Sequence, residues 1–195
     1  TVTQLLRFDI VTAHLGTALF FFITLLVIGT ALTPYKATGQ AGNLPGISFT
    51  ATVLVYLQSL LGALVGSRWA LHQCFGGDQL CTVMYTHIFG LIPPTIAVLA
   101  LVFLSRRTVA LHPTLRKLAN YAGGLLILQI LLGFATFRLH LQVEPLTVTH
   151  QLIGASLLGV LVAFTVFAVR DWIDTRSISG YNQELNSSAT SDVSC

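Results

Sequence analysis

The chain has 195 residues, of which 54% are hydrophobic and 9% are charged, and its formal net charge is +3. A soluble domain usually carries about 25% charged residues, so this composition excludes an ordinary soluble globule. So small a charge excess gives no reason to expect nucleic acid as a partner. The mean hydropathy of +0.78 instead indicates lipid as the solvent.

Five apolar runs follow one another along the chain. A spanning helix needs roughly 20 mostly apolar residues, whereas a membrane barrel strand has about ten residues of alternating polarity. No Asp or Glu interrupts the interior of any run. The sequence therefore predicts an all-α, polytopic membrane protein. Its five transmembrane helices are expected at about 10–32, 48–66, 83–104, 118–138 and 147–169.

Basic residues predict how these helices cross the membrane. Arg106, Arg107, Arg116 and Lys117 lie in one short segment between the third and fourth runs. The positive-inside rule places such a loop in the cytoplasm. With five spans threaded from that loop, the N-terminus is expected outside and the C-terminus in the cytoplasm.

Two kinds of helix alternate along the chain. The second run contains LQSLLGALVGS and the fourth LQILLGFATFR, which share a Gln followed four residues later by Gly. The first, third and fifth runs contain VTAHLG, YTHIFG and VTHQLIG, in each of which a His lies close to a Gly. Such internal similarity indicates a duplicated unit. Because the first run is a His helix without a Gln–Gly partner before it, we expect further helices upstream.

This alternation divides the chain into four parts. Residues 1–32 are expected to be the last helix of an incomplete N-terminal half, and 33–47 a cytoplasmic connecting loop. Residues 48–169 form a complete four-helix bundle in this prediction. The polar residues 170–195 are expected to be a disordered cytoplasmic tail.

Three histidines are the strongest candidates for a functional site. His14, His87 and His150 each lie near the start of a helix that enters from the outer face, so all three are expected at one depth. A single His in such a place often only hydrogen-bonds a neighbouring helix, but ionisable residues inside membranes are rare and usually functional. Neutral imidazoles are common ligands of haem iron.

His87 and His150 lie within the complete four-helix set, so we expect them to fill the two axial positions of one haem iron. Zinc is the rival metal. It requires three or four ligands, and no Asp, Glu or Cys lies at that depth in the helices.

Several neighbouring residues have two open interpretations. Four glycines lie in the His and Gln–Gly helices: Gly62, Gly90, Gly133 and Gly154. Because they have no side chain, they either leave room for a flat porphyrin ring or allow close helix packing. Pro93 and Pro94 are expected to bend the third helix, which either widens a cavity or sets helix packing.

Two arginines and two cysteines lie at the outer ends of these helices. Arg68 and Arg138 either contact haem propionates or act as interfacial anchors. Cys74 and Cys81 flank a Gly-Gly in the loop HQCFGGDQLC. In an outer compartment this pair can form an exposed, redox-active disulfide, or it can remain as two free thiols.

Taken together, the motifs resemble those of the haem A synthase family, membrane proteins that oxidise a methyl group of haem O. The resemblance rests on the Gln-x-x-x-Gly helices, the Cys-x6-Cys loop and the three His helices, and it covers roughly residues 1–172. The sequences of two segments, SRWALHQCFGGDQLC and FRLHLQVEPLTVTHQLIGA, resemble those of bacterial members most, in particular cyanobacterial ones. The implied location is the bacterial cell membrane or a thylakoid-type membrane.

The resemblance implies eight helices in two pseudo-symmetric halves. It matches His87 and His150 to the pair that holds a b-type haem in the C-terminal half. It matches His14 to the last-helix histidine of the N-terminal half, where haem O binds as substrate, and Cys74 and Cys81 to an outer-loop cysteine pair. The N-terminal half's other histidine and its outer-loop glutamate match nothing in this sequence, so His14 is expected to lack its partner.

The implied activity is that of an oxidoreductase. Two successive hydroxylations of the haem O methyl, with loss of water, leave the formyl group of haem A for cytochrome oxidase assembly. The implied partners are membrane lipid, haem O synthase, the oxidase assembly machinery and an unidentified electron donor. The alternative is a non-catalytic bis-His b-type cytochrome that relays electrons, which has no use for His14. A third interpretation is a transporter or scaffold whose histidines bind protons.

Overall fold

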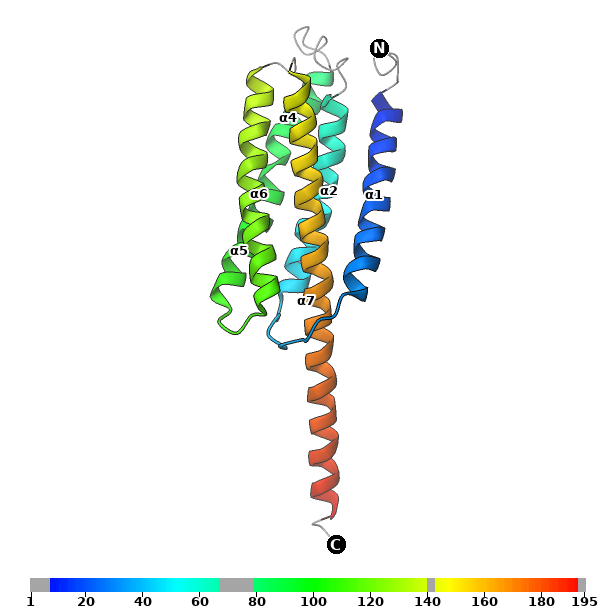
Figure 1. Cartoon of the computed structure of the whole chain (residues 1–195), viewed down its shortest axis with the longest axis vertical. Coiled ribbons are helices and arrows are strands. Elements are labelled where there is room, and N and C mark those ends of the chain that lie inside the picture. Colours follow the sequence, from blue (N-terminus) through cyan, green and yellow to red (C-terminus); the bar gives the residue numbers. More distant parts are fainter. Residues whose placement is uncertain (1–7, 67–78, 140–142, 193–195) are drawn as a thin grey trace.

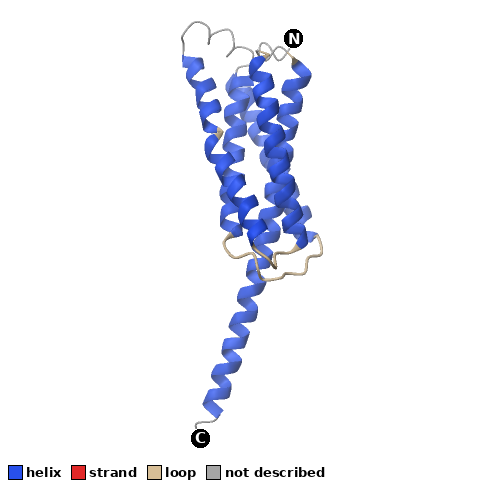
Figure 2. Ribbon diagram, turned by 90° about the vertical axis from the view of Figure 1, so that its left-hand side faces the viewer, coloured by secondary structure: helices blue, strands red, loops and turns tan. Residues whose placement is uncertain are grey.

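A computed structural model of the chain describes the backbone of residues 8–66, 79–139 and 143–192. Every regular element in these ranges is a helix, which confirms the all-α prediction (Figures 1 and 2). The helices are α1 (Phe8–Leu32), α2 (Leu44–Gly66), α4 (Gln79–Gly90), α5 (Ile92–Arg107), α6 (Pro113–Arg138) and α7 (Glu144–Asp192).

Five segments are long and apolar enough to cross a membrane, which confirms the predicted number of spans. They are Asp9–Leu32, Leu44–Val65, Thr82–Arg107, Pro113–Arg138 and Glu144–Asp174. Most extend a few residues beyond the predicted apolar runs. At the start of α6 the reason is local: His112 accepts a hydrogen bond from the N–H of Thr114 (3.2 Å), and Pro113 occupies the first helical turn. These are favourable helix-start residues, so the helix begins before the chain becomes apolar.

The third span consists of two helices rather than one bent helix. The break falls at Leu91, between α4 and α5, and thus just before Pro93 and Pro94. A proline lacks an N–H and its ring crowds the carbonyl four residues earlier. Two successive prolines therefore remove two donors that would have continued α4, so the helix ends before them.

Four of the five spans form a bundle, and α1 lies beside it. Around the bundle, α2 packs against α4 and α5, α5 against α6, α6 against α7, and α7 against α2. Helix α1 packs mainly against α2 and α7, outside this ring (Figure 1). We call the end at which α1, α4 and α7 begin the upper end, and the end with residues 33–43 and 108–112 the lower end.

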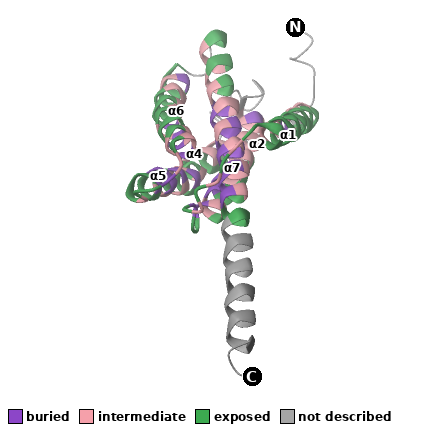
Figure 3. Cartoon of the chain, turned by 60° about the horizontal axis from the view of Figure 1, so that its bottom comes forward, coloured by how far each residue is buried: buried purple, intermediate pink, exposed green. Residues whose placement is uncertain are grey.

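Helix α7 is the centre of the packing (Figure 3). Half of its most apolar window is buried within the protein, against 11% for α1. Its buried side chains include Leu158, Leu161 and Phe164, which join one core with Leu101 of α5 and Leu115 of α6. Helix α1 therefore buries a much smaller share of its surface than α7 does.

The polar C-terminal segment differs from the sequence prediction. Residues 170–195 are expected to be disordered, but α7 continues as helix to Asp192, and Asp171 is fully buried against the loop 33–43. Extending an existing helix costs much less than starting one. The segment 170–192 contains no proline that would stop the extension.

Candidate functional site

His87 and His150 lie on opposite corners of the four-helix bundle, toward its upper end. His87 is on α4 and His150 on α7, and the ring order of the helices makes these two diagonal rather than adjacent. Both imidazoles are partly buried, and they are near enough to interact electrostatically. The fold therefore brings together the two histidines that the sequence pairs.

The imidazole of His87 is held by α2. Nε2 of Gln58 lies 3.1 Å from Nδ1 of His87 and donates a hydrogen bond of 2.6 Å to the His87 carbonyl oxygen. Because this nitrogen donates to a carbonyl, it belongs to the amide NH2 group, so Nδ1 is the acceptor. A neutral His87 in this arrangement carries its proton on Nε2.

Glycines allow the side chains of His87 and Gln58 to lie close to the backbone of the facing helix. A Cβ atom at Gly62 would lie 2.9 Å from Cε1 of His87, so the imidazole rests on the α2 backbone one turn above Gln58. In the reverse direction, a Cβ at Gly90 would lie 2.9 Å from Oε1 of Gln58. Each helix thus presents a glycine to the polar side chain of the other. We call His87, Gln58, Gly62 and Gly90 the α2–α4 cradle.

The same arrangement recurs between α6 and α7. Nε2 of Gln129 lies 3.2 Å from Nε2 of His150. A Cβ at Gly133 would lie 3.0 Å from Cε1 of His150, and one at Gly154 would lie 3.1 Å from Nε2 of Gln129. We call His150, Gln129, Gly133 and Gly154 the α6–α7 cradle.

The glycines therefore have a role that neither sequence interpretation includes. They accommodate the imidazole and amide groups of the partner helix, and not a direct backbone contact between helices.

The two cradles differ in how fully their polar atoms are paired. Nδ1 of His150 and Oε1 of Gln129 are both buried and have no hydrogen-bond partner. Buried polar atoms without a partner are uncommon and call for an explanation. Because Gln129 contacts Nε2 of His150, its Nδ1 is the nitrogen left for another ligand.

The donor set favours a pair of ligands and not a cluster. Among the side chains that the structure describes, no group of three or more His, Cys, Asp or Glu converges in a way that could hold a metal ion. Zinc needs such a group. Two imidazoles on a diagonal suit instead a metal that brings its own equatorial ligands, as haem iron does.

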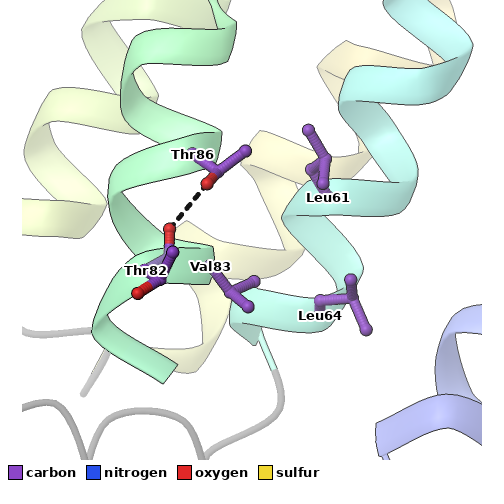
Figure 4. Close-up of a pocket in the computed structure, with 5 residues that line it drawn as sticks. All are labelled: Leu61, Leu64, Thr82, Val83 and Thr86. Carbon is purple, nitrogen blue, oxygen red and sulfur yellow. Dashed lines mark hydrogen bonds between the residues drawn. The ribbon is translucent and has the colours of Figure 1, made fainter. Parts of the chain in front are cut away.

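A cleft of about 380 Å³ opens between α2 and α4 above His87 (Figure 4). Leu61 and Leu64 of α2 face Thr82, Val83 and Thr86 of α4 across it. The Thr86 hydroxyl donates to the Thr82 carbonyl of its own helix at 2.7 Å, so the wall is largely apolar. Val83 lies one helical turn above His87, which places the cleft directly over the imidazole.

His14 lies away from this pair. It is exposed on α1, whereas Gly16 and Leu19 of the same helix are buried. Gly16 contacts α2: a Cβ there would lie 3.0 Å from Leu60, and its carbonyl accepts a hydrogen bond from Tyr56 at 3.1 Å. Two positions along a helix is a rotation of about 200°, so His14 faces away from the bundle.

The remaining predicted residues are only partly described. Arg138 ends α6 at the upper end, exposed, with its guanidinium 5.0 Å from the ring centre of Phe134. This contact fits an interfacial anchor; a propionate contact stays a prediction. Arg68, Cys74 and the side chain of Cys81 lie outside the described residues, and so does the predicted disulfide.

Sequence reasoning missed the role of the two glutamines. It used Gln58 and Gln129 only to recognise the repeat. The signal was present, since a Gln and a Gly four residues apart share one helix face, and each His has a Gly three or four residues after it. Two such helices facing each other pair His with Gly and Gln with Gly.

Comparison with known proteins supplies a family. The model of the cytochrome oxidase assembly protein family matches residues 1–162. Comparisons with curated proteins and with solved structures gave no match. Because the family match covers residues 1–162 of 195, the chain belongs to the cytochrome oxidase assembly protein family, the haem A synthase family that its motifs resemble.

Proposed function

We propose that His87 and His150 are the two axial ligands of a b-type haem, and that the chain takes part in oxidising haem O to haem A. The family acts in cytochrome oxidase assembly, as an oxidoreductase of haem A biosynthesis. The observation that carries the proposal is the pair of matching cradles, which hold two imidazoles on one diagonal of the bundle.

The nitrogens of both imidazoles fit this role. Gln58 occupies Nδ1 of His87, so Nε2 is the nitrogen left for iron. In His150 one buried nitrogen is unpaired. A neutral imidazole that binds iron through Nε2 keeps its proton on Nδ1, so Gln58 would then turn its carbonyl oxygen to that proton. Gln58 and Gln129 are thus the residues that orient the ligands and tune their basicity.

A bound haem would supply reversible one-electron chemistry at its iron. The chain would position it in a largely apolar bundle that excludes water. We further propose that His14 is a ligand of the substrate haem O. Its exposed position on the far side of α1 supports a separate substrate site. Arg138 and Arg68 are candidates for propionate contacts, and Cys74 and Cys81 for electron or thiol exchange with a partner.

Orientation in the membrane is part of the proposal. Arg106 and Arg107 end α5 at the lower end, and Arg116 and Lys117 lie in the first turns of α6. The positive-inside rule puts this end in the cytoplasm. The N-terminus then lies outside, the C-terminus inside, and both cradles lie toward the outer face of a bacterial cell membrane or thylakoid-type membrane.

The direct test is the haem spectrum of histidine variants. The protein is purified from cells supplied with haem, and absorbance is recorded for the parent, His87→Ala, His150→Ala and His14→Ala. We expect both cradle variants to lose the low-spin b-type spectrum, because each removes an axial ligand. His14→Ala is the matched control and should retain it. An unchanged spectrum in both cradle variants contradicts the ligand assignment.

A second measurement separates the enzyme from an electron-relaying cytochrome with the same ligand pair. Cells that make haem O express the parent or His14→Ala, and the extracted pigments are analysed. Haem A in the parent extract and its loss in His14→Ala support the oxidation. A parent that binds b-type haem but yields no haem A supports the relay.

A further inference from the structure

One buried carboxylate holds the connection between α1 and α2 against α7. Asp171 of α7 is fully buried at the lower end of the bundle. Its Oδ1 accepts hydrogen bonds from the main-chain N–H of Thr38 at 2.6 Å and from the hydroxyls of Tyr35 and Thr38, both at 3.2 Å. Figure 1 shows this connection passing the lower part of α7.

The loop is folded around the other carboxylate oxygen as well. Oδ2 accepts from the main-chain N–H groups of Gln40 and Ala41, both at 2.9 Å. Gly39 and Gly42 have φ angles of 72° and 50°, which only glycine adopts readily, and they turn the chain so that its N–H groups converge. Asp171 therefore supplies the charge around which this loop is built.

The residue before it holds the end of α1. The Arg170 guanidinium donates to the carbonyls of Thr30 and Thr33, at 3.1 and 2.8 Å. Carbonyls in the last turn of a helix have no donor within that helix. The same guanidinium lies 5.5 Å from the ring centre of Tyr35, and that ring stacks on Phe167. We call Arg170 and Asp171, with their contacts to residues 30–41, the clamp.

Tyr35 also links the clamp to the other lower loop. Its ring centre lies 4.5 Å from that of His112, the residue that caps α6. Burial and the neighbouring Asp171 carboxylate raise the pKa of Tyr35 above its ordinary value. The hydroxyl therefore keeps its proton and remains a donor to Asp171 at physiological pH.

The clamp lies at matched distances from two candidate haem ligands. Tyr35 follows His14 by 21 positions, and Asp171 follows His150 by the same 21 positions. Helices α1 and α7 both run from the upper to the lower end. At a rise of about 1.5 Å per residue, His150 stands roughly 32 Å above Asp171 and His14 roughly 27 Å above Leu32, the last residue of α1, so the two histidines stand at similar heights.

We propose that Arg170 and Asp171 are positioning residues that fasten the lower end of α1 to α7 and so hold His14 level with His150. Helix α1 also packs on α2 and α7 higher up, where Leu19 is buried and Tyr56 donates to the Gly16 carbonyl. The clamp adds the hydrogen bonds that fix its lower end. The attachment itself does not require haem. That the attachment also positions His14 in a substrate site rests on the proposed function.

Distances between spin labels test the attachment directly. One pair of labels, at Ala18→Cys on α1 and Gln151→Cys on α7, reports the position of α1. A second pair, at Leu131→Cys on α6 and Gln151→Cys, reports the bundle. All four labelled or control positions are exposed in the structure. The native cysteines are replaced by serine in every sample, and Ile173→Ala, which truncates an exposed side chain on the same helix, is the control.

We expect Asp171→Ala and Asp171→Asn to lengthen and broaden the α1–α7 distance while the α6–α7 distance stays as in the parent. The asparagine keeps the shape but lacks the charge and one acceptor, so it separates hydrogen bonding from packing. Tyr35→Phe should give a smaller broadening, and Ile173→Ala none.

Unchanged α1–α7 distances in the Asp171 variants overturn the proposal. Should Asp171→Ala disturb the α6–α7 pair too, Asp171→Asn and Tyr35→Phe decide, and a parent-like α1–α7 distance in both overturns it. A parent protein that binds no haem counts against the proposed function, whereas the α1–α7 distances alone decide on the clamp.

Discussion

The two cradles contain the same residue types at nearly the same spacing, yet they hold their histidines differently. Gln58 contacts two acceptors on α4, the ring nitrogen and the carbonyl oxygen of His87. Gln129 contacts only a ring nitrogen of His150, and its own Oε1 remains buried and unpaired. The α6–α7 cradle therefore holds two buried polar atoms without a partner, whereas no atom of the α2–α4 cradle is both buried and unpaired.

The helix break at Leu91 explains this difference. His87 lies in the last turn of α4, whose final carbonyls have no donor within the helix. Gln58 donates to one of them. His150 lies inside the continuous helix α7, where Gly154 supplies the usual backbone donor. A second bond from a glutamine is needed at His87 and has no counterpart at His150.

The largest expected effect comes from removing each glutamine. Gln58→Leu leaves two acceptors of His87 buried without a donor, and each such group costs about 1–3 kcal/mol. Gln129→Leu leaves one further ring nitrogen of His150 unpaired, but it also removes the unpaired Oε1. We expect Gln58→Leu to destabilise the haem-free protein by roughly 1–3 kcal/mol more than Gln129→Leu. Denaturant unfolding in detergent measures both, and equal losses would contradict the difference between the cradles.

A smaller and more even effect is expected from filling the glycines. Gly62→Ala and Gly133→Ala put a methyl group about 3 Å from an imidazole carbon. Overpacking costs typically 1–3 kcal/mol, and the better helix propensity of alanine offsets up to about 1 kcal/mol of it. The two variants should lose similar stability, because the contacts are alike in both cradles.

Two other glycines serve as controls for that experiment. A Cβ at Gly46 of α2 or at Gly124 of α6 would meet no atom within 4 Å. Gly46→Ala and Gly124→Ala should therefore gain stability, by about 0.5–1 kcal/mol. A gain at Gly62 or Gly133 as well would show that the imidazoles do not rest on these glycines. Thermal unfolding midpoints of the four variants decide.

The spans and the histidine pair were predictable from sequence because each rests on one strong physical signal. Run length alone distinguishes a membrane helix, and the repeat of His and Gln–Gly helices placed His87 and His150 in one bundle. The partners of these histidines were not predictable in the same way. Which atom of Gln58 meets which atom of His87 depends on helix rotation, and no periodicity in one helix determines that.

Two other features lay beyond composition. The run from 83 to 104 is apolar enough over its whole length to suggest one bent helix, and the break at Leu91 follows only from the lost donors at Pro93 and Pro94. Asp171 follows the last apolar run, so the sequence predicts it to be part of an exposed polar tail. Its burial depends on main-chain N–H groups of a loop 130 residues earlier, which carry no sequence signal of their own.

The smallest expected effect is also the sharpest test of why the cradles differ. Replacing Pro93 and Pro94 by alanine restores donors for the carbonyls of Phe89 and Gly90. Helix α4 can then continue into α5, which places the N–H of Leu91 to donate to the His87 carbonyl. Gln58 then has only the ring nitrogen to satisfy, as Gln129 has. In this background Gln58→Leu should cost about 1 kcal/mol less than in the parent. A double-mutant cycle on denaturant unfolding measures this coupling, with Gln129→Leu in the same background as the control that should not change. A coupling near zero would mean that the two bonds of Gln58 do not arise from the break, and the difference between the cradles would then need a cause outside α4.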